Sequence, residues 1–338
     1  MLTVRLKVNI RKQRRKRMKS LKKVFKVVVA MMAMLMLVSQ LAVAHAENEG
    51  VLSGKTVGFA QTDSMSSWRT TETDSITQAI EGAGGKIIVK DAGGDIATQE
   101  SDVRDLIAAG VDYLIVAPLE SNGLQSVLEE AMLGGIPVIL VDRAVEGEAG
   151  THYTTAIMSD FYWEGQQGAL VLNEALPDGG KVVVINGGYD SPTSTERQDG
   201  FIENLNDNFE VVAEQNGQWL MPEAQAVMEN VLQAQGVESI DAVFAVTDDM
   251  IQGAKRALES ANVVVGEDVL TIGIDGSIQA LEDVAAGLQL ASITCSPFFG
   301  PIVLETIEKI ENGEEVEEQI TVDDQVYTID NVDLEMGY

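Results

Sequence analysis

The sequence predicts an α/β protein built as two lobes, each a doubly wound parallel sheet. Short apolar runs alternate with amphipathic stretches, and this alternation restarts near Ile157. About ten strands in one chain are more than the sheet of an ordinary single domain holds. The strands are expected at 56–60, 86–92, 113–118, 137–142, 154–159, 181–186, 209–215, 242–247, 269–275 and 288–295.

Each expected element follows from its residue pattern. Strands that are apolar throughout need helices on both faces of their sheet, and strand–helix repetition makes the strands parallel. The connecting stretches supply such helices: in "ESDVRDLIAAG", Val103, Leu106 and Ile107 fall on one face and Gly110 ends the pattern. The tail, 321–338, alternates in polarity and predicts an edge strand followed by a loop.

Residues 1–46 have the pattern of a secretory signal peptide. Twelve Lys or Arg residues without an acid precede an apolar run of 18 residues, which ends at the small-residue site "AHA". A single membrane anchor is the alternative, because 18 residues is borderline for a span. The cleavage site and the polar "ENEG" after it favour cleavage behind Ala46, and Met18 is an alternative start of the chain.

Composition excludes several classes of function. Removal of residues 1–46 takes away 12 of the 23 Lys and Arg residues and none of the 53 acids, so the mature chain would carry a net charge of −42. Such a surface repels nucleic acid and anionic membranes. The mature chain has one Cys, Cys295, and one His, His152, so it offers neither a disulfide nor a Cys/His zinc cluster. His152 also lacks the sequence context of a catalytic triad, and no cofactor-binding loop is visible. We therefore expect neither metal nor cofactor.

Aromatic, acidic and guanidinium side chains gather where the expected strands end. In open parallel sheets, ligands bind at these carboxyl ends. The residues in question are Trp68, Arg69, Asp142, Arg143, Arg197, Trp219, Thr247, Asp248, Asp249 and Asp275. A neutral sugar needs this set, because its hydroxyls donate to carboxylates and accept from Arg while its C–H face packs on an indole. The pattern therefore favours a binding site for a monosaccharide.

Each of these residues also has a structural alternative. Trp68 could pack at a helix start, Trp219 could lie in a surface loop, and Trp163 is expected to pack within a helix. Asp142 and Arg143 could be a helix cap and a surface cation. Asp248 could be an N-cap, Asp249 a first-turn acid facing the helix dipole, and Asp275 a turn residue.

Several motifs together resemble the sugar-binding proteins of ABC transporters, of the ribose/galactose type with the type I periplasmic binding fold. They are "VGFAQ…SSWRTTET", "DYLIVAPLESNG", "IPVILVDR", "ER…GF", "TDDM", "IGIDG" and the final "MGY", spread over the mature chain. The resemblance implies a three-strand hinge between the lobes. It implies an N-terminal lobe of 55–158 plus 296–321 and a C-terminal lobe of 159–295 plus 322–338.

The same resemblance implies which residues contact the ligand. Carried over by motif, they are Trp68, Arg69, Asp142, Arg143, Arg197, Trp219 and Asp275. At two places the chain departs from the family pattern. Thr247 and Asp248 stand where Asn-Asp is usual, and Thr294 and Cys295 stand where relatives have Gln or Glu; all four are expected at ligand-contact positions, and the departures bear on which sugar is bound.

The resulting expectation is a monomeric, non-catalytic periplasmic receptor that delivers a monosaccharide, such as galactofuranose or ribose, to an ABC permease in the inner membrane. A sugar-responsive repressor would need a basic helix-turn-helix, and an enzyme would need a metal cluster or cofactor loop. A sensory receptor that serves a chemotaxis protein or a histidine kinase would share every residue discussed, so it stays open as an alternative.

Overall fold

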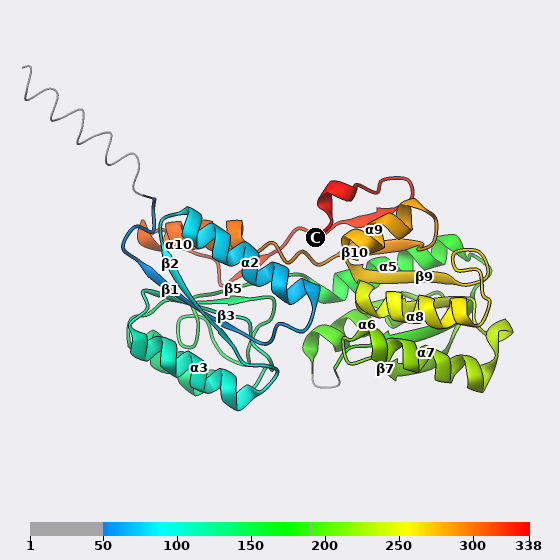
Figure 1. Cartoon of the computed structure of the whole chain (residues 1–338), viewed down its shortest axis with the longest axis horizontal. Coiled ribbons are helices and arrows are strands. Elements are labelled where there is room, and N and C mark those ends of the chain that lie inside the picture. The colour runs from blue at the N-terminus through cyan, green and yellow to red at the C-terminus, as the bar shows by residue number, and fades with distance from the viewer. Residues whose placement is uncertain (1–49, 189–190) are drawn as a thin grey trace, which may run out of the picture. The chain divides into compact units, whose positions relative to one another are not determined.

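The computed structural model describes residues 50–188 and 191–338, and residues 54–338 form one compact unit. The predicted signal peptide lies outside the described residues. Within them, no helix combines the length and the apolar character that a membrane span requires. The chain of residues 54–338 forms two six-stranded sheets flanked by helices (Figure 1).

The first sheet has the strand order β11-β5-β4-β3-β1-β2, and all its pairings are parallel. Its strands are β1 (Thr56–Gln61), β2 (Lys86–Asp91), β3 (Tyr113–Val116), β4 (Val138–Val141), β5 (Thr155–Met158) and β11 (Gln319–Thr321). The associated helices are α2 (Ser67–Gly82), α3 (Ile96–Ala109), α4 (Gln125–Leu133) and α10 (Gly300–Glu311). Helix α3 ends at Gly110 in the left-handed conformation, as its pattern predicts.

The second sheet has the order β12-β10-β9-β8-β6-β7. Its strands are β6 (Gly180–Asn186), β7 (Phe209–Asn216), β8 (Ala242–Ala245), β9 (Leu270–Asp275), β10 (Ala291–Thr294) and β12 (Val326–Thr328). Only β12 runs antiparallel to its neighbour, as an edge strand. The associated helices are α5 (Phe161–Ala175), α6 (Pro192–Asn204), α7 (Met221–Gln235), α8 (Asp248–Ser260) and α9 (Ile278–Ala285), with short 3₁₀ turns η1 (Val237–Ser239) and η2 (Leu334–Met336).

The predicted α/β class with two doubly wound sheets is confirmed. The central strands β3, β4 and β8 are buried along their whole length, since helices cover both faces. Strand β2 differs from the expectation: it lies at an edge, and Ile88 and Val89 remain partly exposed. Strand β11, which the sequence pattern did not predict, joins the first sheet beside β5.

Three connections carry the chain between the two sheets: from β5 to α5, from β10 to α10, and from β11 to β12. Helix α10 returns to the first sheet and packs against α2, where Gly300 lies so close to Ser75 that a Cβ atom would come within 2.2 Å of the Ser75 carbonyl oxygen. Three crossings fit a hinge between two lobes. The residue boundaries predicted for the lobes stay a prediction.

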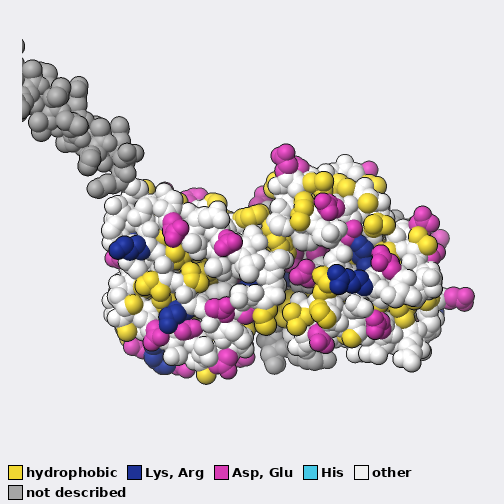
Figure 2. Space-filling model, viewed as in Figure 1, with side chains coloured by type: hydrophobic (Ala, Val, Ile, Leu, Met, Phe, Trp, Pro, Cys, Tyr) yellow, Lys and Arg dark blue, Asp and Glu magenta, His cyan; other side chains and the backbone are white. Residues whose placement is uncertain are grey.

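Charged side chains of one sign do not form a single large patch on the face shown in Figure 2. Asp and Glu are scattered over it, and Lys and Arg stand at a few separate places. Local groupings of charge inside the molecule, rather than the total charge, therefore determine what a binding site can hold.

Candidate ligand-binding site

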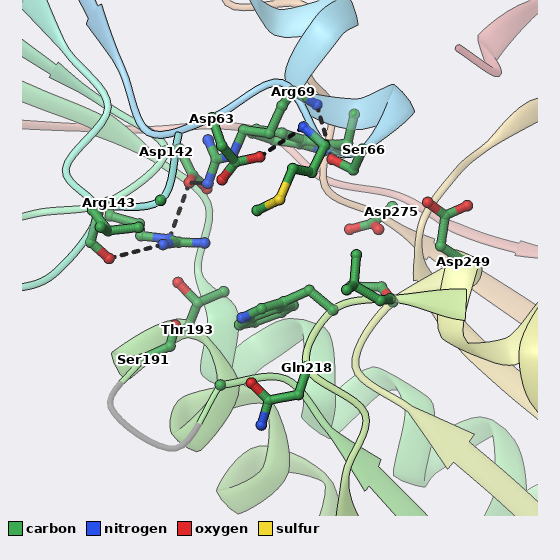
Figure 3. Close-up of a pocket in the computed structure, with 18 of the residues that line it drawn as sticks. Asp63, Ser66, Arg69, Asp142, Arg143, Ser191, Thr193, Gln218, Asp249 and Asp275 are labelled. Carbon is green, nitrogen blue, oxygen red and sulfur yellow. Dashed lines mark hydrogen bonds and ion pairs between the residues drawn. The ribbon is translucent and has the colours of Figure 1, made fainter. Parts of the chain in front are cut away.

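A cavity of about 540 Å³ opens at the carboxyl ends of strands from both sheets. From the first sheet, residues that follow β1 and β4 line it, together with the start of α2. From the second sheet, residues that follow β7, β8 and β9 line it, together with the start of α6. Figure 3 shows these side chains converging on the same space. We call the two sets the first wall and the second wall of the cavity.

Asp142 is the centre of the first wall. It follows β4 with a left-handed backbone (φ 65°), which is uncommon for a residue other than glycine. Its Oδ2 atom lies 2.5 Å from Nη2 of Arg69 and 3.2 Å from Nε of Arg143. Arg143 also donates from Nη1 to the Leu119 carbonyl at 3.2 Å. One carboxylate thus forms ion pairs with two guanidinium groups at the cavity surface, and the pair with Arg69 is also a hydrogen bond.

The charges of the first wall are mutually stabilised. Burial alone would raise the pKa of Asp142, but Arg69 and Arg143 outweigh it and leave that pKa below its ordinary value. Behind the wall, Oε2 of Glu72 lies 2.9 Å from Nη1 of Arg69. Burial raises the pKa of Glu72 to about 6 against the opposing effect of Arg69. Because the pKa of Asp142 is lowered, this residue is an anion at neutral pH and can pair with both cations.

Arg197 is the centre of the second wall. Its Nε atom lies 2.6 Å from Oε2 of Glu164. Its Nη1 atom donates to the Val246 carbonyl at 2.8 Å and lies 3.6 Å from Oδ1 of Asp275. Asp275 ends β9 in a strained backbone conformation with φ 127°. Burial raises its pKa well above the ordinary value, because Arg197 compensates the desolvation only in part.

Close packing of α5 on α6 places Arg197 beside Glu164. A Cβ atom at Gly165 would come within 1.9 Å of the Arg197 carbonyl oxygen, and one at Gly200 within 2.1 Å of the Tyr162 carbonyl oxygen. Glycine at both positions therefore lets the two helix backbones touch. Burial raises the pKa of Glu164 to about 7, and Arg197 opposes this rise.

Two indoles add apolar surface. Nε1 of Trp68 donates to the Cys295 carbonyl at 2.7 Å, so this ring is fixed to the connection between β10 and α10. The guanidinium carbon of Arg69 lies 4.7 Å from its ring centroid. Trp219 follows β7 with φ 64°, and Arg143 lies 5.7 Å from its ring centroid. Cations of the first wall thus face both rings.

Most of the residues that the sequence singled out come together here. The cavity lining includes Trp68, Arg69, Asp142, Arg143, Arg197, Trp219, Thr247, Asp275 and Cys295. Thr247 is also the N-cap of α8, since its hydroxyl accepts from the Met250 amide at 3.3 Å. Whether these residues contact a ligand stays a prediction.

Asp248 and Thr294, which were also expected at ligand-contact positions, are not among the residues that line this cavity. The Asp248 carboxylate turns inward and accepts from the amides of Gly276 and Ser277, at 2.9 and 3.0 Å. It thereby supports the turn after Asp275. The Thr294 hydroxyl donates to Asp324 at 2.9 Å and so joins two of the connections between the sheets.

Other residues line the cavity without having been predicted to bind. They are polar or flexible side chains on loops or at the starts of α6 and α8: Asp63, Met65, Ser66, Glu120, Ser191, Thr193, Gln218 and Asp249. Ser191 and Thr193 are mostly buried, and their hydroxyl oxygens have no partner within the described residues. Asp249 takes the place expected for Asp248. The Ser-rich stretch after β1 drew attention to the loop that contains Ser66. A loop has no periodicity, however, from which one could tell which of its side chains point into the cavity.

The side chains suit a polyol better than a metal ion. Within residues 50–188 and 191–338, no three His, Cys, Asp or Glu side chains are grouped as metal ligands would be. Guanidinium groups paired with carboxylates beside indole faces can instead donate to hydroxyls, accept from them and cover C–H groups. Fold and site together define a two-lobed α/β binding protein.

Comparison with known proteins identifies the family. The model of the periplasmic binding protein domain matches residues 57–314, and the chain therefore belongs to that family. It is 29% identical over 292 residues to the galactofuranose-binding protein YtfQ of Escherichia coli K12, with 85% of this chain and 92% of that protein covered. It is 33% identical over 240 residues to the ribose import binding protein RbsB of Bacillus subtilis 168, with 70% and 75% covered.

The fold agrees with a solved relative. The crystal structure of a galactofuranose-binding protein superposes with a TM-score of 0.80 at 29% identity, covering 84% of this chain and all of that one. The two-lobe type I periplasmic binding fold, predicted from the motifs, is therefore confirmed. So is the resemblance to sugar-binding proteins of ABC transporters.

Proposed function

We propose that this protein is the substrate-binding component of an ABC importer and captures one neutral monosaccharide, such as galactofuranose or ribose, in the cavity between its lobes. The observation that carries the proposal is the convergence of Arg69, Asp142, Arg143, Arg197 and Asp275 on one cavity from two sheets. Relatives named for binding galactofuranose and ribose support this class of ligand.

The energetics are adequate. A micromolar dissociation constant corresponds to about −8 kcal/mol. Hydrogen bonds to charged groups contribute roughly 1.5–3 kcal/mol each, so a few of them with ring burial reach this value after the ordering cost. Pairing of each guanidinium with a carboxylate matters here, because a neutral ligand would otherwise bury uncompensated charge. A wrong epimer would leave a charged group unpaired and bind far more weakly.

The cellular setting belongs to the same proposal. A cleaved N-terminal signal would bring a monomer to the periplasm, where it would hand its sugar to a permease in the inner membrane. We propose no catalytic role: the side chains at the cavity are ion-paired or hydrogen-bonded in ways that suit holding hydroxyls. Residues from both walls would make contact only when the lobes close, so the sugar would stabilise the closed state.

A thermal-shift screen followed by calorimetry tests the proposal. The ligands would be D-ribose, D-galactose, D-fructose and a methyl galactofuranoside, with glucuronate as an anionic control. We expect a single sugar site with a micromolar or lower dissociation constant, no binding of the control, and an unchanged NMR spectrum of the sugar after long incubation. Absence of binding to every neutral sugar, or conversion of the bound one, would contradict the proposal.

A further inference from the structure

Two buried glutamates stand behind the arginines of the two walls. Glu72 and Glu164 are both 0% exposed, and neither belongs to the described residues that line the cavity. Oε2 of Glu72 is 2.9 Å from Nη1 of Arg69, and Oε2 of Glu164 is 2.6 Å from Nε of Arg197. In each wall a glutamate thus lies beneath an arginine of the cavity surface, although the two pairs arise on unrelated helices.

Stability alone gives no reason for these glutamates. In both, the second oxygen, Oε1, is buried and has no hydrogen-bond partner within the described residues. A buried carboxylate with one unsatisfied oxygen is costly, and a well-packed apolar side chain in place of a buried ion pair is often at least as stable. The glutamates therefore serve something other than the free energy of folding.

Geometry indicates what that is. A guanidinium group is a rigid planar fork, so two anchors at different nitrogens define its orientation. Arg69 has Glu72 at Nη1 and Asp142 at Nη2, while Arg197 has Glu164 at Nε and the Val246 carbonyl at Nη1. In each case the glutamate supplies an anchor from the side away from the cavity. Glu72 is itself held by Nε2 of Gln61 at 2.9 Å.

We propose that Glu72 and Glu164 are positioning residues, one for each wall, which orient Arg69 and Arg197 for the ligand and thereby set its affinity. The role in affinity rests on the proposed function, whereas the role in orientation can be tested without any ligand. Loss of either carboxylate would free its guanidinium to rotate about its remaining anchor, so part of the binding free energy would be spent on ordering it again.

The ionised carboxylates are the effective form, which gives the proposal a signature in pH. Glu72 faces Arg69 and Asp142, with Arg143 beyond them, and burial raises its pKa to about 6. Glu164 faces Arg197, Asp324, Cys295 and, across Arg197, Asp275, and burial raises its pKa to about 7. Protonation removes the anchor charge, so sugar affinity should fall as pH drops from 8 to 5.5.

The variants Glu72→Gln and Glu164→Gln keep the side-chain shape and remove the charge. Asp283→Asn is the matched control, because Asp283 forms a buried ion pair with Lys255 that does not reach the cavity. The whole mature protein would be labelled with ¹⁵N-arginine, which gives guanidinium signals for few residues. Calorimetry would follow between pH 5.5 and 8 with the sugar from the panel that binds wild type most tightly.

Without ligand, we expect slowly exchanging signals of the Nη1–H group of Arg69 and of the Nε–H group of Arg197 in wild type and in Asp283→Asn. Each signal should be lost in its own glutamine variant. With sugar at pH 8, affinity should fall about tenfold in each variant and less than twofold in the control. The decline of affinity between pH 8 and 6 should be flatter in Glu164→Gln than in wild type.

Guanidinium signals that persist in both glutamine variants, or affinities within twofold of wild type, would overturn the positioning role. If Glu72→Gln does not fold, Glu164→Gln decides alone, because it lies in the other sheet's helices. If no sugar binds wild type, the proposed function fails, and the ligand-free signals still decide whether the glutamates orient the arginines.

Discussion

The two walls of the cavity use the same residue types with a different balance of charge. In the first wall, Asp142 is shared by Arg69 and Arg143, and Glu72 balances the second cation. In the second wall, Arg197 serves both Glu164 and Asp275, and Asp249 has no ion-pair partner within the described residues. The cavity-facing charges of the first wall, Asp142, Arg69 and Arg143, thus form a closed network of ion pairs, whereas the second wall leaves Asp249 without such a partner in the described residues.

This difference indicates a division of work. A closed network holds its groups rigid before ligand arrives and offers guanidinium N–H groups to hydroxyl oxygens. Asp249 and Asp275 in the second wall are suited to accept from hydroxyl hydrogens, and burial raises the pKa of both carboxyl groups. The walls should therefore respond differently to the loss of a carboxylate.

The largest effect is expected when the first wall loses its shared anion. Asp142→Ala removes the anion that Arg69 and Arg143 share and leaves Arg69 with Glu72 alone, and breaking such a buried pair costs about 3–5 kcal/mol. We expect calorimetry to show a loss of sugar affinity of roughly 1,000-fold, or about 4 kcal/mol, together with a lower urea midpoint. Circular dichroism at low temperature would verify the fold. Unchanged affinity in a folded variant would remove Asp142 from the site.

Loss of the Asp275 carboxylate in the second wall should have a milder effect than loss of Asp142. Asp275→Asn removes a carboxylate whose nearest cation is 3.6 Å away, so it breaks a weaker pair. We expect affinity to fall roughly 10- to 30-fold, or about 2 kcal/mol, with the urea midpoint unchanged or higher because a costly buried charge is gone. A loss as large as that of Asp142→Ala, in both affinity and stability, would show that the walls are equivalent.

These contrasts bear on what the sequence alone can predict. The strands were predictable because buried parallel strands are apolar throughout, and the position of Asp142 and Asp275 followed from the rule that ligands bind at carboxyl ends. Chain order alone thus located the centre of the first wall, where a short strand leads directly to Asp142. The same held for Trp68 and Arg69, which begin a helix just after β1.

The direction in which a side chain at the start of a helix points was harder to predict. Asp248 and Asp249 are adjacent in the first turn of α8, so their side chains differ by about 100° around the helix axis. The amides of Gly276 and Ser277, distant in sequence, hold Asp248 inward and leave Asp249 for the cavity. Such a choice depends on how α8 lies against β9, which no local pattern encodes.

Glu72 and Glu164 were missed for a related reason. A glutamate on an amphipathic helix is normally a solvated residue, and only the packing of a second element buries it. For Glu164 the signal was present in the glycines at 165 and 200, since an isolated glycine within a helix often marks close packing. For Glu72 no comparable signal exists in the sequence.

Stability should depend on pH through the second wall. The pKa of Glu164 is raised to about 7, so the folded state holds its proton to a higher pH than the unfolded chain does. Its contribution to stability is therefore present at low pH and is lost as pH rises through about 7. We expect the free energy of unfolding, measured in urea, to fall between pH 5 and 7 with a slope of up to about 1.4 kcal/mol per pH unit from this group.

Glu164→Gln should reduce that slope. The carboxyl of Asp142 does not contribute to it directly, because its pKa is lowered and its titration lies at more acidic pH. Identical slopes in Glu164→Gln and wild type would mean that Glu164 is ionised throughout this range. If Glu164 titrates as expected, its contribution to stability falls as pH rises whereas sugar affinity rises, which separates an effect on folding from an effect on the orientation of Arg197.

The smallest effect concerns the indoles. Trp68→Phe keeps an aromatic ring and removes the hydrogen bond from Nε1 to the Cys295 carbonyl, which leaves a buried carbonyl without its donor. We expect a loss of about 1 kcal/mol of unfolding free energy and a change of less than threefold in affinity. Trp219→Phe is the matched variant, because the indole nitrogen of Trp219 makes no hydrogen bond to the described residues. The unfolding free energy of this variant should stay within about 0.5 kcal/mol of wild type. Equal losses of unfolding free energy in the two variants would show that the hydrogen bond from Trp68 to the Cys295 carbonyl does not stabilise the fold.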